Sequence, residues 1–597
     1  MPCESQPAKF LAARCPLPGN MLLCRIHYGL AHGQTLSFPA AMKRLLFLIH
    51  LALSLTAAAG TTASGPNAAV TVHPLATEAA LDAMRRGGNA VDAAIAAGVM
   101  LGVVDGHNSG LGGGCFMLIR SPDGKATALD GREMAPAAAT RDMFLRDGKA
   151  DTSLSQTGAL AAGVPGSLAV YELAAKRFGK LPLADALNKA ADRAEQGFEI
   201  SASYASRLKS AAPELAKFPA SRAVFLTAEG KPPAAGTILR QPDLAASCRR
   251  IAKEGTGWFY GGGFAAAVEQ WMKSNGGLLT AGDFQTYQVA EREPLRTTYR
   301  GREIIGFPPP SSGGVHVAQI LNILATRPAP GLSLTTGDGL HFTAEAMKLA
   351  FADRAYWLGD PDFAKVPRGL ASEDYARTLA GRIVMDRNVT VEEHGTPPHA
   401  GDDIFRKHTT HFSAADASGW WVACTATVNT TFGSKVVIPG TGIVLNNQMD
   451  DFSIQPGVRN AFGLVGAESN AVAPRKRPLS SMSPTLVLEK SQPILTLGAA
   501  GGPTIITQVV CTAVRVLDDG LPLDKALAAP RLHHQWSPDV LRIESATGPA
   551  LLDDLRRRGH KLETTREMGA CNGIQRNPDG TLQAAGDPRV PGAAGAF

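Results

Sequence analysis

The sequence changes character at a polar stretch, residues 388–408, and this change constrains the fold more than any other feature. Before it, amphipathic segments of helical spacing dominate residues 164–381. After it come strand-like runs, the first of which, HFSAAD, alternates apolar and polar residues. The stretch itself is polar, contains prolines and has no periodicity, which is typical of a surface loop. We therefore expect a helix-rich first part and a strand-rich second part, joined across an exposed loop.

Two adjacent threonines, Thr409 and Thr410, stand at the end of this loop. The β-propensity of threonine is one explanation. The alternative is that the chain is cut before Thr409, which then becomes a new N-terminus. A threonine hydroxyl needs a base within hydrogen-bond reach. A freed α-amine has a pKa of about 7.7–8.0, which suits a general base near neutral pH.

Composition is that of a globular protein and gives little support to nucleic-acid binding. Of the 597 residues 45% are hydrophobic and 19% are charged. The net charge of +6 is concentrated in residues 1–59, which hold five basic residues and one acidic residue. No basic stripe with interleaved aromatic residues follows, so we expect no nucleic-acid partner.

The N-terminal region predicts export from the cytosol. From Met42 the chain has a basic pair, an apolar run and the small residues Ala57–Ala59. This pattern predicts a secretory signal over residues 42–59, cleaved after Ala59. A membrane anchor is the alternative, but the apolar run is short for a transmembrane span. Residues 1–41 resemble no known element, and we attribute them to a start codon assigned too far upstream. We expect a periplasmic or secreted protein.

The cysteines and histidines predict neither a disulfide framework nor a metal site. Five cysteines follow the signal, scattered and without a C-x-x-C pair. Cys115, Cys424 and Cys511 lie in apolar surroundings and are expected in the core. The adjacent His533 and His534 point apart on any regular element, so a shared metal is not expected.

Four polar or glycine-rich segments follow or precede predicted strands in the second part. They are NTTFG, NNQMDDFS after the predicted strand GIVL, RPLSSMSPT, and GAAGGP before a predicted helix. Each is weak evidence alone, because such residues are common in turns and caps. Strand ends are nevertheless where a sheet protein collects a functional site. In the first part, CFMLIRS and KATALDG predict a hairpin, preceded by an alanine-rich helical region over residues 69–104.

These motifs, in this order, resemble γ-glutamyltranspeptidases (glutathione hydrolases). The likeness rests on TTHFS, NTTFG, NNQMDDFS, RPLSSMSPT and GGP, with DGREMAP, PPPSSGG and APRLHHQW, and it spans nearly all of the chain after the signal. It implies an α/β (α+β) N-terminal-nucleophile hydrolase with an αββα sandwich. It also implies one precursor, autocleaved between His408 and Thr409. The large subunit, residues 60–408, and the small catalytic subunit, residues 409–597, would then pair as a heterodimer.

The resemblance also implies the roles of individual residues. Thr409 matches the nucleophile and Thr427 a threonine that supports it. Gly501 and Gly502 match the oxyanion hole, where glycine permits close approach of two N–H groups. Arg132 matches the arginine that holds the substrate α-carboxylate, since a guanidinium pairs a carboxylate bidentately. Further residues match substrate-binding positions: Ser480 and Ser481 for the carboxylate, and Asp451, Asn429 and Gln448 for the α-ammonium.

The implied activity is transfer and hydrolysis of the γ-glutamyl group of glutathione and similar compounds. Water, amino acids or dipeptides would be the acceptors, and no metal or organic cofactor would be needed. One rival is a cephalosporin (glutaryl) acylase on the same scaffold. A glutaryl group lacks the α-ammonium, so the carboxylate of Asp451 favours γ-glutamyl substrates. The other rival is an uncleaved, inactive binding protein.

Two positions depart from the pattern of the family. Pro503 follows the glycine pair and has no N–H to donate. Phe462 stands in the stretch PGVRNAFGLVGAES, where some relatives have a tyrosine. The resemblance implies a lid in this stretch, and phenylalanine can pack there but cannot hydrogen-bond across the pocket.

Overall fold

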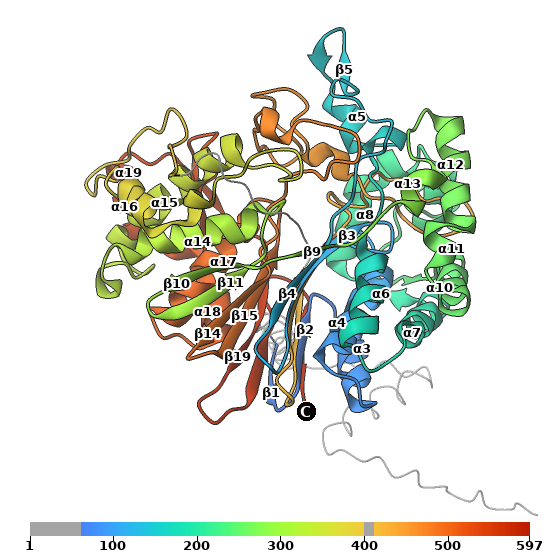
Figure 1. Ribbon diagram of the computed structural model, residues 1–597, viewed down its shortest axis with the longest axis horizontal. Coiled ribbons are helices and arrows are strands. Elements are labelled where there is room, and N and C mark those ends of the chain that lie inside the picture. The colour runs from blue at the N-terminus through green and yellow to red at the C-terminus, as the bar shows by residue number, and fades with distance from the viewer. Residues whose placement is uncertain (1–60, 399–410) are drawn as a thin grey trace, which may run out of the picture. The chain divides into compact units, whose positions relative to one another are not determined.

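Two seven-stranded antiparallel sheets lie at the centre of the protein (Figure 1). The computed structural model describes residues 61–398 and 411–597. The leader, the signal, His408 and Thr409 therefore lie outside the described residues. Within the described part, no helix is both long and apolar enough to cross a membrane.

The first sheet combines strands from both ends of the chain and from its middle. Its order is β1 (Thr62–Gly65), β20 (Leu582–Ala585), β19 (Ala570–Arg576), β15 (Gln492–Ala500), β14 (Thr485–Glu489), β11 (Arg302–Gly306) and β10 (Leu295–Tyr299). The second sheet is built in the same way. Its order is β21 (Ala593–Ala596), β2 (Ala68–Thr71), β12 (His411–Ala415), β13 (Trp421–Thr427), β3 (Gly114–Arg120), β4 (Ala126–Gly131) and β9 (Ala290–Arg292).

The sheets pack face to face through an apolar layer, and the strand alternation explains how. Along β3, Phe116 and Leu118 belong to the layer between the sheets. Met117 and Ile119 belong to the core on the opposite side, under the helices. Phe116 stacks on Phe307 of the other sheet, with 4.1 Å between ring centroids. Because β3 is buried on both faces, nearly all of its residues are apolar.

Helices cover the outer face of each sheet, which completes the expected αββα sandwich (Figure 1). The second sheet is covered by α3 (Pro74–Arg85), α4 (Ala90–Val104) and α6 (Ser167–Phe178), and α7 (Leu183–Gln196) packs on α4. On the first sheet lie α14 (Ser312–Ala325), α17 (Thr504–Leu517) and α18 (Leu523–Ala528). Helices α15 (Gly337–Trp357), α16 (Glu373–Ala380) and α19 (Pro549–Arg557) pack further out on that side. Helix α4 shows why the alanine-rich segment is helical, because Asn89 and Asp92 form a capping box at its start.

Smaller elements complete the chain. The helices are α5 (Thr152–Gln156), α8 (Ala202–Leu215), α9 (Pro219–Phe225), α10 (Pro242–Glu254), α11 (Gly257–Tyr260), α12 (Gly263–Asn275) and α13 (Ala281–Gln285). The short strands are β5 (Leu145–Arg146), β6 (Lys149–Ala150), β7 (Phe198–Glu199), β8 (Ile238–Leu239), β16 (Leu532–His533), β17 (Leu541–Glu544) and β18 (Leu562–Thr565). The 3-10 turns are η1 (Ala159–Ala161), η2 (Ala329–Gly331), η3 (Arg368–Ala371), η4 (Gln448–Asp451), η5 (Glu468–Asn470) and η6 (Ser545–Thr547).

The division into a helix-rich and a strand-rich part is only partly right. The predicted hairpin is confirmed as β3 and β4, and the first strand of the second part as β12. The first part, however, also supplies seven of the fourteen strands of the two sheets, including β9, β10 and β11 inside the region expected to be helical. These strands are short, and β10 has mostly polar residues at solvent-facing positions, so they lack a strong apolar alternation.

The expected strand GIVL is also wrong. Residues 442–447 form no strand; the local pairing is an isolated bridge between Val437 and Val444. The 3-10 turn η4 follows directly.

The cysteine prediction is confirmed, since Cys115, Cys424 and Cys511 are free thiols buried in the core.

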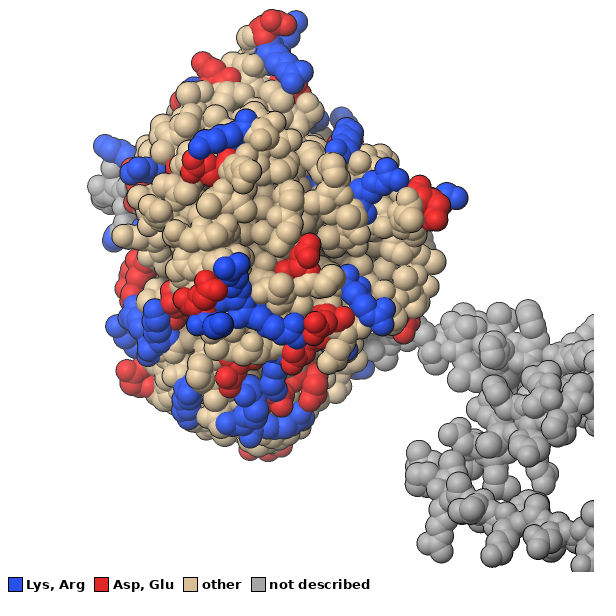
Figure 2. All heavy atoms as spheres, turned by 90° about the vertical axis from the view of Figure 1, so that its right-hand side faces the viewer, with Lys and Arg blue, Asp and Glu red and all other residues tan. Residues whose placement is uncertain are grey.

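On the face formed by α7, α10 and α12, lysine and arginine side chains lie intermixed with acidic ones (Figure 2). Arg249, for example, pairs with Asp192 and Glu195.

Candidate active site

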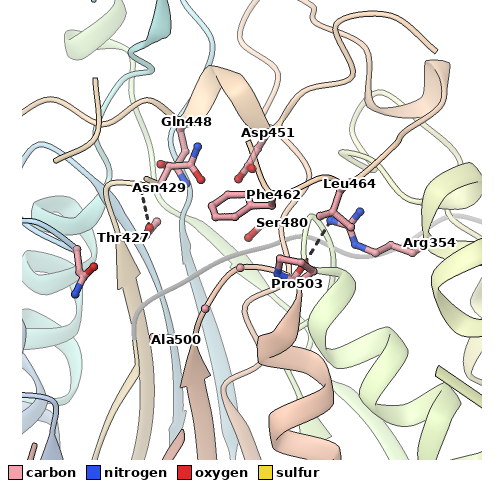
Figure 3. A pocket seen from close by; sticks show the side chains of 14 residues that line it. Arg354, Thr427, Asn429, Gln448, Asp451, Phe462, Leu464, Ser480, Ala500 and Pro503 are labelled. Atoms are coloured by element: carbon pink, nitrogen blue, oxygen red, sulfur yellow. Dashed lines mark hydrogen bonds between the residues drawn. The ribbon is translucent and has the colours of Figure 1, made fainter. Parts of the chain in front are cut away.

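A pocket opens at one end of the sandwich, where strands β13 and β15 end (Figure 3). Its wall is formed by Asn108, Arg354, Thr427, Asn429, Gln448, Asp451, Phe462, Leu464, Ser480, Ser481 and the turn Ala500–Pro503. The segments that supply these residues are far apart in sequence. They meet because the two sheets place the corresponding strand ends at the same edge.

The turn Gly501–Gly502 connects β15 to the start of α17 and can be formed only by glycine. Its φ angles are +130° and +60°. A Cβ on Gly502 would come within 2.6 Å of Phe462 Cδ1. Within the described part of the chain, neither N–H group of the turn donates a hydrogen bond. Two free N–H groups beside a helix N-terminus form a site that stabilises negative charge.

Asp451, at the end of η4, is held by a buried arginine. Its Oδ2 accepts a hydrogen bond from Arg132 Nη2 at 2.6 Å, and its Oδ1 lies 3.5 Å from Asn460 Nδ2. The Arg132 side chain is fully buried and also donates through Nε to the carbonyl of Pro478 at 3.2 Å. Arg132 is thus adjacent to the pocket, behind Asp451, and does not belong to its wall.

A second arginine, Arg354 of α15, does face the pocket (Figure 3). Its Nε donates to Ser312 Oγ at 3.0 Å and its Nη2 to Ser481 Oγ at 3.4 Å. Burial lowers the pKa of Arg354 to about 10, an effect that Asp451 opposes, so the guanidinium stays charged at neutral pH. Arg354, Ser480 and Ser481 together offer donors to an anion in the pocket.

The opposite wall carries polar side chains at the end of β13. Thr427 Oγ1 accepts a hydrogen bond from the Asn429 N–H at 2.7 Å, which fixes the turn after the strand. Asn429 has a φ of +79° and donates through Nδ2 to the Asn447 carbonyl at 2.9 Å. Gln448 Oε1 is buried and has no hydrogen-bond partner among the described residues. A buried amide oxygen without a partner is suited to accept a hydrogen bond from a ligand.

Two further carboxyls next to Asp451 have raised pKa values. Burial raises the pKa of Glu133 to about 7, against the opposing effect of Arg132, whose Nη1 lies 3.3 Å away. Burial also raises the pKa of Asp450 to about 6, although Ser155 and the Ala461 N–H donate to it. Around the pocket, charge therefore depends on pH near neutrality.

Of the residues predicted from sequence, the structure brings eight to the pocket wall: Thr427, Asn429, Gln448, Asp451, Ser480, Ser481, Gly501 and Gly502. Arg132 lies one residue behind it. Sequence reasoning missed Arg354, Asn108 and Leu464 as wall residues. Phe462, expected in a lid, does lie at the pocket, where it is half-buried against Gly502. The individual roles of these residues stay predictions.

Thr409 lies outside the described residues, but its neighbour His411 shows where the chain resumes. His411 begins β12 and pairs with Thr425 of β13, two residues before the pocket residue Thr427. The His411 ring is buried, and burial lowers its pKa to about 3. The strand that follows the predicted cleavage point therefore starts at the pocket end of the second sheet.

Elsewhere, the described residues include one cluster with metal-ligand spacing, formed by His341, Glu345 and His560. Lys348 Nζ lies 2.9 Å from Glu345 Oε1, so an ammonium already provides the positive charge there. His341 Nδ1 and His560 Nε2 are hydrogen-bonded at 2.8 Å. The contacts of His341, Glu345 and His560 are therefore those of a buried hydrogen-bond network, in which Lys348 takes the place that a metal ion would have. His533 and His534 bond to different partners, Thr507 and Asp539, and do not converge.

Comparison with known proteins identifies a family and several relatives of this chain. Residues 76–597 match the family model described as gamma-glutamyltranspeptidase. A glutathione hydrolase proenzyme of Escherichia coli K12 is 45% identical over 521 residues, covering 87% of this chain and 89% of the relative. Among solved structures, a cephalosporin acylase from Bacillus halodurans has a TM-score of 0.80 at 28% identity, covering 90% of this chain and 97% of that one. The gamma-glutamyltranspeptidase of Helicobacter pylori has a TM-score of 0.52 at 37% identity, covering 56% and 93%.

A family match over most of the chain, an αββα sandwich and a glycine turn facing a carboxylate thus lead to one conclusion: the chain belongs to the γ-glutamyltranspeptidase family.

Proposed function

We propose that this protein is a glutathione hydrolase and γ-glutamyl transferase that acts through a threonine nucleophile released by its own cleavage. The observation that carries the proposal is the pairing of charges in one pocket. Asp451 stands on one side and Arg354 with Ser480 and Ser481 on the other, next to the Gly501–Gly502 turn. A carboxylate and a guanidinium across a small cavity complement the ammonium and carboxylate of an α-amino acid.

The proposed nucleophile is Thr409, exposed by cleavage after His408. Strand β12, which begins two residues after Thr409 in the sequence, starts at the pocket end of the second sheet, and this supports the proposal. The Thr409 amine serves as the base for its own hydroxyl. Thr427, at the end of the adjacent strand, supports the nucleophile. The cleavage divides the chain into residues 60–408 and 409–597, which stay together as a large and a small subunit.

The reaction is an acyl transfer in two steps. Thr409 Oγ attacks the γ-carbonyl carbon of the donor, and its proton passes by way of the amine to the departing nitrogen as the amide C–N bond breaks. The oxyanion formed on the way is stabilised by the N–H groups of Gly501 and Gly502. Water or an acceptor amine then attacks the γ-glutamyl ester, gives up one proton, and restores the threonine hydroxyl.

The α-amino acid group of the donor fixes the orientation of the γ-carbonyl. Asp451, Asn429 and Gln448 are the proposed acceptors around its ammonium. Ser480, Ser481 and the two arginines are the proposed donors to its carboxylate. Arg354 faces the pocket in the structure, whereas Arg132 is bonded to Asp451 and would share its guanidinium between Asp451 and the substrate. No step in this scheme requires a metal or an organic cofactor.

A glutaryl acylase is the second candidate, favoured by the structural likeness to the Bacillus halodurans cephalosporin acylase. A glutaryl group carries no ammonium and would leave Asp451 with Arg132 alone. A pocket whose carboxylate is positioned to bind an ammonium group should lower kcat/KM for such a substrate by orders of magnitude. We therefore prefer the γ-glutamyl donor. The predicted signal over residues 42–59 supports a location of the proposed activity in the periplasm or outside the cell.

The first experiment combines intact-mass analysis with N-terminal sequencing of the purified, exported protein. We expect two polypeptides, the smaller of which begins TTHFS, and release of glutamate from glutathione. A Thr409→Ala variant should stay a single chain without activity. A wild-type protein that remains one chain and leaves glutathione intact would contradict the proposal, whereas normal cleavage of the Thr409→Ala variant would remove Thr409 from its role.

A further inference from the structure

An irregular segment of the chain runs along α15, the helix that supplies Arg354 to the pocket. The segment, residues 384–398, is called the strap below; the structure describes all of it, and none of it is helix or strand. Its contacts begin near the start of the helix, where His341 Nε2 is hydrogen-bonded to the Val384 carbonyl at 2.9 Å. They end at the last residue of the helix, Trp357. The strap therefore follows α15 over most of its length.

The middle of the strap is held through its backbone. The Val389 N–H donates to Glu345 Oε2 at 3.2 Å, and Lys348 Nζ donates to the Val389 carbonyl at 3.0 Å. The nearby Val391 carbonyl accepts a hydrogen bond from Trp536 Nε1 at 2.7 Å. Backbone groups outside regular secondary structure need such partners when they are removed from water. The strap thus has a defined path, although it has no regular structure.

The end of the strap contacts the last turn of α15, mainly through the peptide groups of Gly395. The Gly395 N–H donates to Asp353 Oδ1 at 2.7 Å, and the Gly395 carbonyl accepts from Trp357 Nε1 at 3.1 Å. We call these two hydrogen bonds the clamp. Asp353 and Trp357 are four residues apart, so they lie on one face of the helix. Beside them the His394 ring stacks on Tyr356, with 3.5 Å between ring centroids.

Asp353 is a buried carboxylate that the proposed reaction does not use. Its Oδ2 accepts two further hydrogen bonds, from Gln319 Nε2 at 2.7 Å and from Tyr375 Oη at 2.9 Å. Burial raises the pKa of Asp353, and the hydrogen bonds from Gly395, Gln319 and Tyr375 oppose that rise. A buried carboxylate is costly unless such donors are in place. The clamp is therefore part of what keeps this turn of α15 in one position.

Arg354 follows Asp353 on the same turn, and its side chain leaves the helix toward the pocket (Figure 3). Successive residues of a helix are about 100° apart around its axis, so one turn can bind the strap on one side and face the pocket on another. The guanidinium of Arg354 donates to Ser312 Oγ and Ser481 Oγ. A shift of this turn would therefore move the guanidinium relative to Ser481.

Position 395 has room for glycine alone. A Cβ there would lie 2.0 Å from Tyr375 Oη and 3.0 Å from Tyr375 Cζ. Contacts this short would force the strap or Tyr375 to move, because a close-packed interior cannot absorb them. Both the strap and Tyr375 are hydrogen-bonded to Asp353.

We propose that the strap positions Arg354 for the α-carboxylate of the donor, with Gly395 and Asp353 as the positioning residues. The inference rests on the proposed function, in which Arg354 is one of the donors to that carboxylate. Neither Gly395 nor Asp353 lines the pocket, so both act through the last turn of α15. Loss of the clamp weakens recognition of the carboxylate and leaves bond making at the γ-carbonyl unchanged.

The test compares two donors that differ only in the α-carboxylate, γ-glutamyl-p-nitroanilide and γ-aminobutyryl-p-nitroanilide. Release of p-nitroaniline gives kcat/KM for each donor. We expect Gly395→Ala to lower the value for the γ-glutamyl donor by about tenfold, mainly through KM, which is the range of one charge-assisted hydrogen bond. The value for the γ-aminobutyryl donor should stay within about twofold of wild type, because that donor has no carboxylate to position.

Three more variants make the test specific. The double variant Gly395→Ala/Tyr375→Phe lacks the hydroxyl nearest to the new Cβ, so its kcat/KM should return to within about threefold of wild type. Trp357→Phe loses the N–H that donates to Gly395 without adding an atom, and it should lower only the γ-glutamyl value, by about threefold. Thr396→Ala, at an exposed position of the strap, is the matched control and should behave like wild type.

The ratio of the two donors does not depend on the amount of folded enzyme, so poor folding of a variant cannot imitate the effect. Equal losses with both donors, no loss with either, or a double variant that fails to recover would each overturn the inference. So would a wild type that cleaves both donors equally well. If Gly395→Ala yields no folded enzyme, the ratio in Trp357→Phe decides in the same way. A wild type that cleaves neither donor would instead overturn the proposed function.

Discussion

The guanidinium of Arg132 and the carboxylate of Asp451 form an ion pair, with 2.6 Å between Nη2 and Oδ2, although 319 residues separate them in sequence. The ion pair links the residue that follows the end of β4 to the last residue of the 3-10 turn η4. Arg132 is fully buried, and 8% of the Asp451 side chain is exposed, toward the pocket. The Asp451 carboxylate therefore contacts a permanent cation, Arg132, on its buried side, and it would contact the proposed substrate ammonium on its pocket side.

Asp451→Asn should reduce γ-glutamyl turnover much more than it reduces cleavage of the precursor. Asparagine keeps the shape and one acceptor but loses the charge, so the buried guanidinium of Arg132 loses its ion pair with Asp451. We expect kcat/KM for γ-glutamyl-p-nitroanilide to fall on the order of a hundredfold. Gel analysis of the same preparations measures cleavage. Equal loss of cleavage and turnover would assign Asp451 to folding or maturation instead of substrate binding.

Gly502→Ala should inactivate the enzyme through the turn and through Phe462. The new Cβ would come within 2.6 Å of Phe462 Cδ1 and would sit at a φ of +60°. We expect kcat to fall by about ten- to a hundredfold as the N–H groups are displaced. Gly520→Ala is the control, because it has a similar φ of +65° but open space around the Cβ. If both variants lose activity alike, backbone strain alone explains the loss.

Glu133→Gln should change the dependence of stability on pH. The folded-state pKa of Glu133 is raised by burial to about 7 from 4.5, so the folded protein binds the proton more tightly than the unfolded chain does. Its contribution to stability is complete below about pH 4.5 and is lost as pH rises through 7. Relative to wild type, the variant should gain in Tm as pH is raised from 5 to 8. Parallel Tm curves would show that Glu133 does not titrate in this range.

Arg354→Lys should raise KM for the donor by about tenfold. Lysine keeps the charge but cannot bond to Ser312 and Ser481 at the same time, as the guanidinium does. Arg132→Lys provides the comparison, since Arg132 holds Asp451 from behind. We expect Arg132→Lys to lower thermal stability as well as activity, because the buried fork to Asp451 and Pro478 is lost. A larger KM effect in Arg132→Lys would make Arg132 the main carboxylate ligand.

The sequence motifs were sufficient to predict most residues of the pocket wall, but they did not predict the side-chain contacts between distant segments. Gly501, Ser480 and Asn429 stand in short motifs whose residue types are tied to turns and strand ends, so their meeting could be expected. Arg354 gives no such signal, because it lies within the long helix α15 and only tertiary packing turns it toward the pocket. The pairing of Arg132 with Asp451 is likewise a property of the packed sheets, which no local pattern encodes.

The strands that were missed have a common physical reason. Strands β9, β10 and β11 lie at or beside a sheet edge and contain residues such as Glu291, Arg296 and Glu303, so they are not apolar runs. Their position is determined by pairing with β4 and β14, which are distant in sequence. The region expected as the strand GIVL has the opposite property, since its residues Ile443 and Leu445 are apolar and buried but belong to no strand.

The strand order also determines what a cut before Thr409 can do to the molecule. In the second sheet β12 lies between β2 and β13, and in the first sheet β14 lies between β11 and β15. Each piece would thus contribute strands that are hydrogen-bonded to strands of the other, and neither has a complete sheet of its own. The cut chain would behave as a complex of complementary fragments. A precursor can refold alone, but two denatured fragments must first find each other, so recovery after unfolding should depend on protein concentration and the mature enzyme should persist mainly by unfolding slowly.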